Sequence, residues 1–171
     1  GDAETRLIAS TGNISLTTGD FGGNIMLTDA TLTAPASNAE VQLSALGGHI
    51  QQVQGTASDG AVSVTLASGL ITAHKVVAEA DNGISLNTAT AIIDLGVNGS
   101  GNIDLTNQGA LTLLDVQAND GTISVTSSGR LTATLVKALG DSDRNDINLT
   151  TLQTGASALT VETLTTSGRG D

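Results

Sequence analysis

The sequence predicts an all-β fold, a β-solenoid with coils of roughly 20 residues, and three observations lead to this prediction. A strand-like phrase recurs eight times along the 171 residues. Most of the phrases follow one another at a spacing that suits one coil of such a fold. The chain also has 21 Gly, one Phe and no Trp, Tyr or Cys, so its core must consist almost entirely of Val, Ile, Leu and Ala.

The recurring phrase is apolar-x-apolar followed by Thr or another small polar residue. Its alternation of apolar and polar residues is the period of a half-buried strand. A glycine one or two residues upstream marks a corner in most copies (Gly12, Gly23, Gly60, Gly83, Gly101 and Gly121). The copies are Ile14–Thr17, Ile25–Thr28, Val41–Ser44, Val62–Thr65, Ile84–Asn87, Ile103–Thr106, Ile123–Thr126 and Ile147–Thr150.

A second pattern follows the phrase in three copies, which begin with Gly69, Gly109 and Gly129. An apolar residue and Thr come two and three residues after each glycine, and a valine comes seven residues after it. In the copy that begins at Ile84, Thr90 stands in the place of the glycine. We expect this copy to keep Ile92 and Val97 in the same register.

The spacing of the phrases indicates the size of one coil. From Val62 onward, successive phrases begin roughly 20 residues apart, which is too short for the common helix-containing repeats. Helix is also disfavoured because Gly, Thr, Val and Ile are spread evenly along the chain. In a solenoid each coil pairs with its neighbours about 4.8 Å away, so equivalent small aliphatic residues stack in a narrow interior.

The amino-terminal third is less regular, because its phrases begin closer together, at Ile14, Ile25 and Val41. We predict one continuous domain, in which residues 60–171 form regular coils and residues 1–59 form irregular or shortened coils. A hairpin packed on the end of the solenoid is the alternative for the amino-terminal third. We expect the chain to be a fragment of a longer array.

The most complete copy resembles the repeats of filamentous-haemagglutinin-like adhesins, which are large secreted bacterial surface proteins. It consists of Gly101–Thr106, Gly109–Thr112 and Val116–Ala118. The resemblance covers residues 60–171 well and residues 1–59 loosely. It implies a right-handed parallel β-helix shaft and a secreted or cell-surface location, and it transfers no catalytic residue.

The charge balance excludes several classes of partner. The chain has 17 acidic and 6 basic residues and a formal net charge of −11. Nucleic acids and anionic membranes need clustered Lys and Arg, and no apolar run reaches the length of a membrane span. The absence of Cys excludes disulfides and Cys-based zinc sites. The expected partners are therefore neighbouring coils, copies of the chain placed end to end, and surface glycans.

One acidic segment is a candidate metal site. Asp141, Asp143 and Asp146 lie close together in the longest spacing between phrases. Alternating carboxylates can hold a hard cation such as Ca²⁺, so calcium is the one cofactor that the sequence suggests. The segment lacks the glycine and the distal Glu of an EF-hand loop. The alternative is a solvated loop in which Arg144 balances part of the charge.

No catalytic constellation is visible, and we expect no enzyme activity. His49 and His74 are the two histidines, and neither has a carboxylate at ligand spacing, so we expect surface or groove-lining positions for both. Polysaccharide hydrolysis needs paired carboxylates. The repeat register aligns Asp94 with Leu113, and Asp115 with Leu135. Together with Asp104, these carboxylates are therefore not expected to form a row.

Two further motifs have structural explanations. Thr-x-Thr pairs begin at Thr31, Thr88 and Thr132, but at different offsets in the repeat, so a flat ice-binding array is not expected. The tripeptide Arg169–Asp171 occurs in integrin ligands, and we interpret it as a corner between coils.

The sequence thus predicts a non-catalytic structural shaft segment of a secreted or cell-surface repeat protein, either an adhesin stalk or a subunit of a self-assembling extracellular filament. The alternative is a solenoid binding module that recognises glycans or a host surface.

Overall fold

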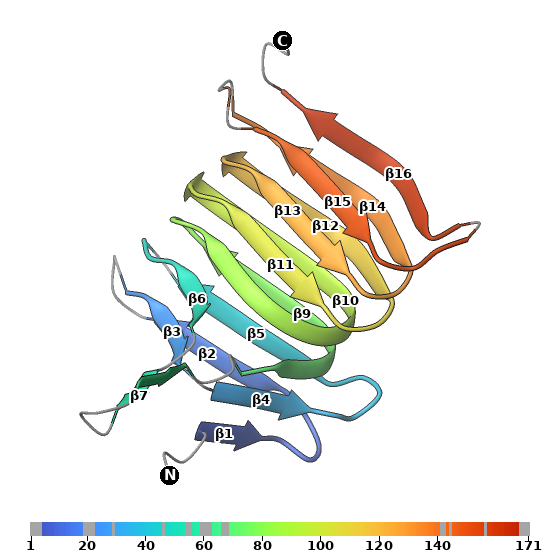
Figure 1. Ribbon diagram of the computed structural model, residues 1–171. Helices are drawn as coiled ribbons and strands as arrows, with labels where there is room; N and C mark the ends of the chain where they lie inside the picture. Colours follow the sequence, from blue (N-terminus) through green and yellow to red (C-terminus); the bar gives the residue numbers. More distant parts are fainter. Residues whose placement is uncertain are drawn as a thin grey trace.

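The fold is all-β, as the sequence predicts. The computed structural model describes residues 5–18, 23–28, 30–45, 47–53, 56–58, 63–65, 69–140, 143, 145–155 and 157–167. These residues form sixteen strands and no helix. Fourteen strands pair in parallel within one sheet that winds through the molecule without closing. The strands are stacked in chain order, so the two termini lie at opposite ends of the stack (Figure 1).

The strands vary in length, from three residues to the 17 of β10. Their bounds are β1 Thr5–Ile8, β2 Ile14–Thr18, β3 Ile25–Thr28, β4 Ala30–Ala34, β5 Glu40–Ala45, β6 Ile50–Val53, β7 Thr56–Ser58, β8 Ser63–Thr65, β9 Ile71–Ala80, β10 Ile84–Ser100, β11 Ile103–Asn107, β12 Leu111–Asp120, β13 Ile123–Ser127, β14 Leu131–Ala138, β15 Ile147–Thr151 and β16 Leu159–Thr166.

Each coil places strand segments at three positions, which follow one another along the chain. Position 1 begins with β1 and β4, position 2 with β2 and β5, and position 3 with β3 and β6. The long strand β9 occupies positions 1 and 2 without a break, because it pairs with both β4 and β5. Later coils hold position 3 in β10, β11, β13 and β15, and the other two positions in β10, β12, β14 and β16.

Two rows of aliphatic side chains show how the coils are held together. At position 3, isoleucines stack directly on one another in six successive coils: Ile25, Ile50, Ile84, Ile103, Ile123 and Ile147. At position 2, a mixed row runs through seven coils: Leu16, Leu43, Ala78, Leu95, Val116, Val136 and Leu164. The interior members of both rows are buried, so the small aliphatic residues fill a narrow core as expected.

Glycines at the corner before position 3 allow the coils to approach closely. A Cβ on Gly101 would overlap the carbonyl oxygen of Asn82, and a Cβ on Gly121 would overlap that of Gly101. Asparagines complete this corner. The Oδ1 of Asn102 accepts a hydrogen bond from the Thr122 amide at 3.0 Å, and the Oδ1 of Asn145 accepts one from the Gly121 amide at 3.1 Å.

The opposite corner contains a ladder of buried polar side chains at the end of position 3. Thr88, Asn107 and Ser127 pair in successive coils and are 0–1% exposed. Their polar atoms are satisfied within the corner. Thr88 Oγ1 donates to Asn107 Oδ1 at 2.8 Å, and Ser127 Oγ donates to the Gly109 carbonyl at 2.7 Å. Because the coils turn here, the side chains supply the backbone with partners that the sheet does not provide.

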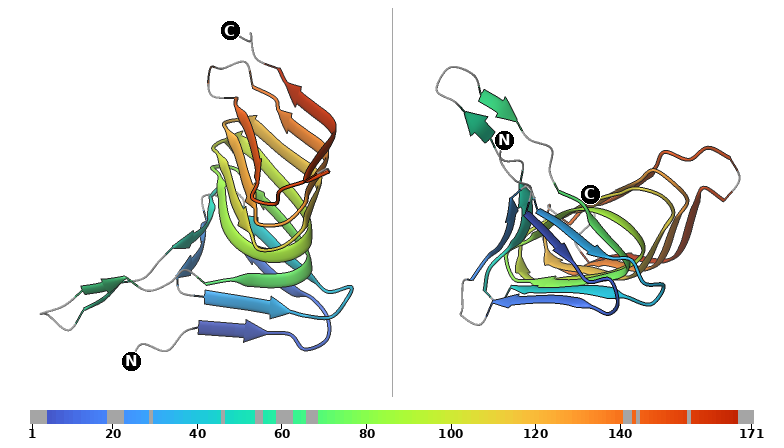
Figure 2. Two further views of the ribbon diagram at one scale, coloured as in Figure 1. Left: turned by 45° about the vertical axis from the view of Figure 1, so that its right-hand side comes forward. Right: turned by 90° about the horizontal axis from the view of Figure 1, so that it is seen from below.

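The prediction that the fourth phrase is a solenoid strand is wrong for the residues described. Ser63–Thr65 is β8, which pairs antiparallel with β7 in a separate two-stranded sheet. The hairpin projects away from the stack (Figure 2). The solenoid strand of this coil is β6, and Ile50 follows Gly48 as Ile103 follows Gly101. At the base of the insertion, Gln52 Nε2 donates to the Gly69 carbonyl at 2.9 Å and links its two sides.

The amino-terminal coils differ from the expectation of shortened coils. Ile14 and Ile25 belong to one coil, at positions 2 and 3, since β2 pairs with β5 and β3 pairs with β6. The chain from Ile14 to its partner Val41 is longer than the chain from Ile103 to its partner Ile123. The first coils therefore contain more chain than the coil from Ile103 to Ile123, whereas the last coil, from Val136 to its partner Leu164, is again as long as the first ones. The predicted boundary between residues 59 and 60 lies outside the described residues.

The predicted register of the copy that begins at Ile84 is also wrong. Val116 pairs with Leu95, and Ala118 pairs with Val97. The register shifts between Ile93 and Asp94, where β12 has one residue more than β10. The extra residue is Leu114, which is 44% exposed. A β-bulge therefore absorbs the difference in length and restores the inward direction of the following side chains.

Candidate functional site

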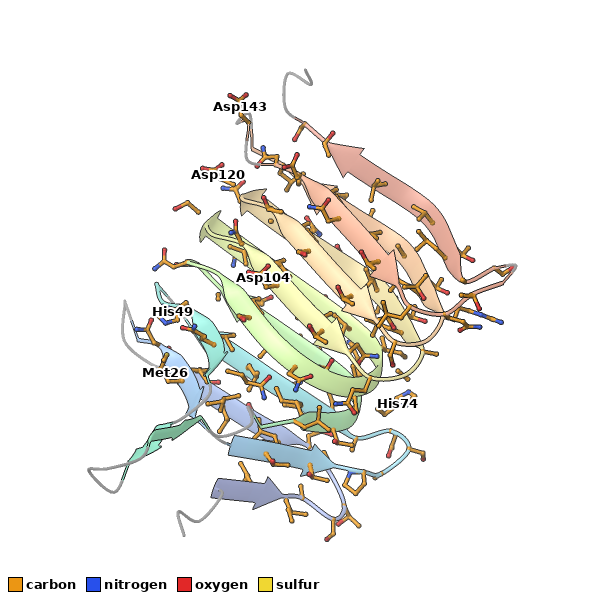
Figure 3. The ribbon with its side chains drawn as sticks, in the orientation of Figure 1. Met26, His49, His74, Asp104, Asp120 and Asp143 are labelled. Carbon is orange, nitrogen blue, oxygen red and sulfur yellow. The ribbon has the colours of Figure 1, made fainter. Side chains whose placement is uncertain are left out.

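The outer face of position 3 is polar, and its side chains are arranged in straight rows. The central row, which we call the Asp104 row, contains Gln51, Ser85, Asp104, Ser124 and Asn148 from five successive coils. A second row of Thr106, Thr126 and Thr150 runs beside it. Because side chains alternate along each strand, these residues face outward while the isoleucine row faces the core. Figure 3 shows Asp104 and His49 on this face.

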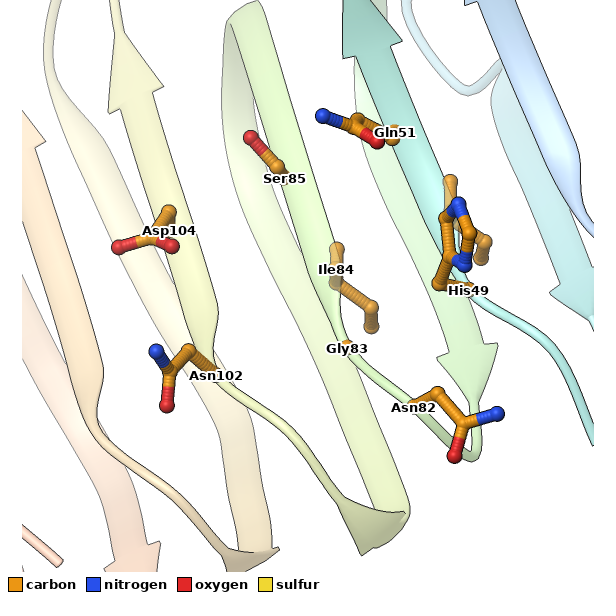
Figure 4. A pocket seen from close by; sticks show the side chains of 9 residues that line it. His49, Gln51, Asn82, Gly83, Ile84, Ser85, Asn102 and Asp104 are labelled. Carbon is orange, nitrogen blue, oxygen red and sulfur yellow. The ribbon is translucent and has the colours of Figure 1, made fainter. Parts of the chain in front are cut away.

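Two adjoining depressions cross the Asp104 row. The first, of about 280 Å³, is lined by His49, Gln51, Asn102 and Asp104 among others. The second, of about 260 Å³, is lined by Asn87, Thr106 and Thr126 among others. Ser85 and Asp104 line both. Figure 4 shows Gln51, Ser85 and Asp104 of the first depression on three neighbouring strands. Because Ser85 and Asp104 also line the second depression, the two join into one polar groove that crosses the strands.

The side chains of the groove carry hydroxyl, amide and carboxylate groups. Hydroxyls donate and accept, amides do both at separate atoms, and the Asp104 carboxylate accepts. Asp104 is exposed, and Ser85 is half-buried. No aromatic side chain other than the His49 imidazole lies among the residues lining the two depressions. The groove therefore presents both donors and acceptors of hydrogen bonds, which suit polar contacts with a hydroxyl-rich or amide-rich ligand.

The two histidines lie at the surface, as predicted. His49 lines the first depression, and its amide donates to Asn24 Oδ1 at 3.0 Å. His74 is exposed and lies near another corner of the coils (Figure 3). Its carbonyl accepts a hydrogen bond from Thr90 Oγ1 at 3.0 Å.

The prediction that Asp94 aligns with Leu113 is wrong, because the bulge at Leu114 brings Asp94 into register with Asp115. Both carboxylates are half-buried on the outer face of position 2. Asp94 Oδ2 lies 3.5 Å from Lys75 Nζ, and Asp115 Oδ1 accepts a hydrogen bond from Gln117 Nε2 at 2.7 Å. Asp104 also faces outward but lies at position 3, on another side of the coil, so the three carboxylates form no common row.

The candidate calcium ligands are divided by the limits of the described residues. Asp141 lies outside them, while Asp143 and Asp146 are exposed. Within the described part of the chain, no three His, Cys, Asp or Glu side chains gather closely enough to hold a metal ion. The described anchor of this segment is Asn145, which is 7% exposed and donates to the Gly140 carbonyl. The corner role of Asn145 was not predicted from the sequence. The available signal is an Asn shortly before the isoleucine of the phrase, as at Asn102.

The Thr-x-Thr pairs lie at different places in the coils, as their different offsets in the repeat predict. Thr88 and Thr90 are buried, at 0% and 5% exposure, whereas Thr132 faces outward in a row with Thr112 and Thr160. The pairs therefore form no common flat array. The tripeptide Arg169–Asp171 lies outside the described residues.

Comparisons of the chain with family models, with curated proteins and with solved structures found no match. The likeness to adhesin repeats therefore stays a prediction from the sequence. Among the described residues, no helix has the length and apolar character needed to span a membrane.

Proposed function

We propose that this chain is a non-catalytic structural shaft segment of a secreted or cell-surface repeat protein, either an adhesin stalk or a subunit of a self-assembling extracellular filament. The observation that carries the proposal is the unbroken pairing of parallel strands from one end of the stack to the other. Adjacent coils share both backbone hydrogen bonds and rows of aliphatic side chains. Bending the stack would break many of these contacts together.

The surface supports the same function. The net charge of −11 opposes non-specific association with nucleic acids and with anionic surfaces. The polar rows at position 3 keep the sheet soluble although its inner face is largely aliphatic. In this proposal, the Asp94–Asp115 pair and Lys75 are structural contacts on the outside of the stack.

Labelling of intact source cells tests the proposal. An antibody raised against this chain should label the surface of intact cells or detect the protein in the medium. Electron microscopy of the purified chain should show particles elongated along the stack. Labelling that requires permeabilised cells, with none outside, would overturn the proposed location and with it the shaft function.

A second candidate function is glycan recognition, and the groove that crosses the Asp104 row favours it. Its hydroxyl, amide and carboxylate groups repeat at the spacing of the coils, about 4.8 Å. A linear chain of neutral sugars presents hydroxyls repeatedly along its length and would match such an arrangement. An acidic polysaccharide would be repelled by the Asp104 carboxylate and by the negative net charge of the protein.

A glycan array separates the two functions. Recognition through the groove predicts binding that Asp104→Ala abolishes and that Asp115→Ala, at position 2 on another side of the coil, leaves unchanged. Equal loss in both variants, or no binding above background, would exclude the groove as a glycan site.

A further inference from the structure

The Asp104 carboxylate has no partner within the described part of the protein. None of the described residues forms a hydrogen bond or a salt bridge with it. The carboxylates at position 2 are different, because Asp94 Oδ2 lies 3.5 Å from Lys75 Nζ and Asp115 Oδ1 accepts a hydrogen bond from Gln117 Nε2. Asp104 is exposed and lines both depressions, so its charge is available to a ligand in the groove.

No Lys or Arg balances this charge from within the groove. The described residues that line the two depressions include neither, and His49 is the only titratable side chain among them besides Asp104. Lys75 lies at position 2, where it contacts Glu40 and Asp94. The net charge of −11 adds a long-range attraction for cations. A ligand that neutralises Asp104 must therefore bring its own positive charge.

The first depression lies where one coil has smaller outward side chains than its two neighbours. Gly83 and Ser85 lie on the outer face of the chain at the start of β10, between the longer side chains of the coils on either side. The space above them, of about 280 Å³, lies just below the usual range for small-molecule sites, so it suits one sugar unit. The flanking side chains are His49 and Gln51 in the preceding coil, and Asn102 and Asp104 in the following coil.

We propose that the groove binds a glycan at a sugar unit with a free amine, whose ammonium group donates hydrogen bonds to the Asp104 carboxylate while its hydroxyls contact Ser85 and Gln51. This inference rests on glycan recognition, the second function proposed above, and names the class of glycan. Hydrogen bonds between an ammonium group and a carboxylate are charge-assisted and stronger than those between neutral groups. An N-acetylated unit has an uncharged amide at the same place and loses this contribution.

The sugar units on either side of the amino sugar should be neutral. The second depression adds the hydroxyls of Thr106 and Thr126, which donate and accept hydrogen bonds and carry no charge. A single amine in an otherwise neutral chain therefore matches the groove. Asp104 is also the only charged member of its row, in which the other side chains are Gln51, Ser85, Ser124 and Asn148.

NMR titration of the isotope-labelled chain with two matched trisaccharides tests the inference. One is a linear trimer of N-acetylglucosamine, and the other is the same trimer with one free amine. Both should shift the backbone amide signals of Ser85 and Thr106. The amine-bearing trimer should have a Kd about fivefold lower, a modest factor because Asp104 is exposed to water. Added salt should reduce this difference, since it screens the ion pair.

Two pairs of variants separate the charge from the site. Asp104→Asn keeps a hydrogen-bond acceptor and removes the charge, so the two trimers should bind it equally well. Asp115→Asn makes the same change in net charge at position 2 and should keep the fivefold preference. Ser85→Gln fills the first depression and should abolish binding of both trimers, whereas Thr132→Gln, at an outward residue outside the groove, should bind both as the wild type does. Circular dichroism of each variant verifies that it is folded.

The possible failures are distinguishable. An equal Kd for the two trimers, or a preference that Asp104→Asn retains, would overturn this inference and leave glycan recognition in place. No shift of the groove amides with either trimer would overturn both. Lysine with blocked termini carries one positive charge without sugar hydroxyls and should bind more weakly than the amine-bearing trimer. If it shifts the same amides with an equal or lower Kd, charge alone governs the groove, and the inference of an amino sugar is wrong.

Discussion

The coils before the β7–β8 hairpin and the coils from β10 to β14 have the same three strand positions and use different amounts of chain to reach them. In the first coils, the chain must run from Ile14 to Val41 before it reaches the same position again. After the hairpin, the shorter stretch from Ile103 to Ile123 completes a coil. The inward rows continue through both regions, so backbone pairing and side-chain stacking determine the strand positions, and corner length is free to vary.

The short corners of the second region depend on close contact between coils. A Cβ on Gly129 would lie 2.6 Å from the Ala110 amide nitrogen, and Gly101 and Gly121 are equally confined. The first region also has one such corner among its described glycines, because a Cβ on Gly48 would overlap the Gly23 carbonyl oxygen, whereas a Cβ on Gly12 would meet no atom within 4 Å. Four substitutions test this comparison between the regions, beginning with the largest expected effect.

Gly121→Ala should lower the free energy of unfolding by about 4 kcal/mol, because the new methyl group would overlap the backbone of the coil below. Gly96→Ala is the control, because its Cβ would lie 3.9 Å from Glu79 Cγ, an ordinary contact distance. Urea denaturation followed by circular dichroism measures both. Equal effects in the two variants would show that close approach at the corner is not what limits these coils.

Leu131→Ala should cost about 3 kcal/mol, because it empties a fully buried site between two coils. Leu159→Ala removes the same atoms from the same row at 42% exposure and should cost less than about 1 kcal/mol. Both are measured by thermal melting at a protein concentration at which the chain is monomeric. A cost for Leu159→Ala that approaches that of Leu131→Ala would mean that the last coil is covered in solution.

Asn107→Ala should cost about 2 kcal/mol. Its Oδ1 accepts hydrogen bonds from Thr88 Oγ1 and from the Thr90 amide, and both donors would stay buried after the substitution. Asn102→Ala, at the other corner, removes one hydrogen bond from an exposed side chain and should cost about 1 kcal/mol or less. If the two variants melt at the same temperature, the buried polar ladder contributes no more to the stability of the fold than the hydrogen bond of an exposed corner does.

Lys75→Met should lower the free energy of unfolding by less than about 1 kcal/mol, the smallest of the four effects. Lys75 Nζ lies 3.8 Å from Glu40 Oε2 and 3.5 Å from Asp94 Oδ2, and its side chain is 26% exposed. This contact joins the last coil before the hairpin to the coils after it. The destabilisation should shrink in high salt, whereas Lys137→Met, the control, should show no salt-dependent loss. A salt-independent loss for Lys75→Met would indicate packing of the side-chain stem instead.

The sequence predicts the regular coils well where length and register agree. Ile103 and Ile123 pair as the spacing of their phrases implies, because both coils have the same corners. Prediction fails where one residue more or less changes the pairing. Leu114 is extra in its coil, so counting from the glycines placed Asp94 opposite Leu113, whereas the structure pairs it with Asp115. A one-residue bulge leaves no compositional signal.

The fourth phrase shows a different reason for failure. Ser63–Thr65 alternates like a solenoid strand and forms a hairpin strand, because alternation does not distinguish parallel from antiparallel partners. The true strand, β6, has Gln52 where the other copies have the second apolar residue of the phrase. The polar groove was also unforeseen. It depends on residues far apart in the sequence that only the stacking brings together, such as His49 and Ser85.

The hairpin also has a practical consequence. The chain leaves the stack after β6 and rejoins it at β9, and Gln52 and Gly69 remain hydrogen-bonded across the opening. The rows of the coils above and below continue in register past this point. The corner therefore accommodates extra sequence without disturbing its surroundings. It is a natural place to graft an epitope, a fluorophore or a binding peptide, displayed beside the stack while the rest of the molecule keeps its architecture.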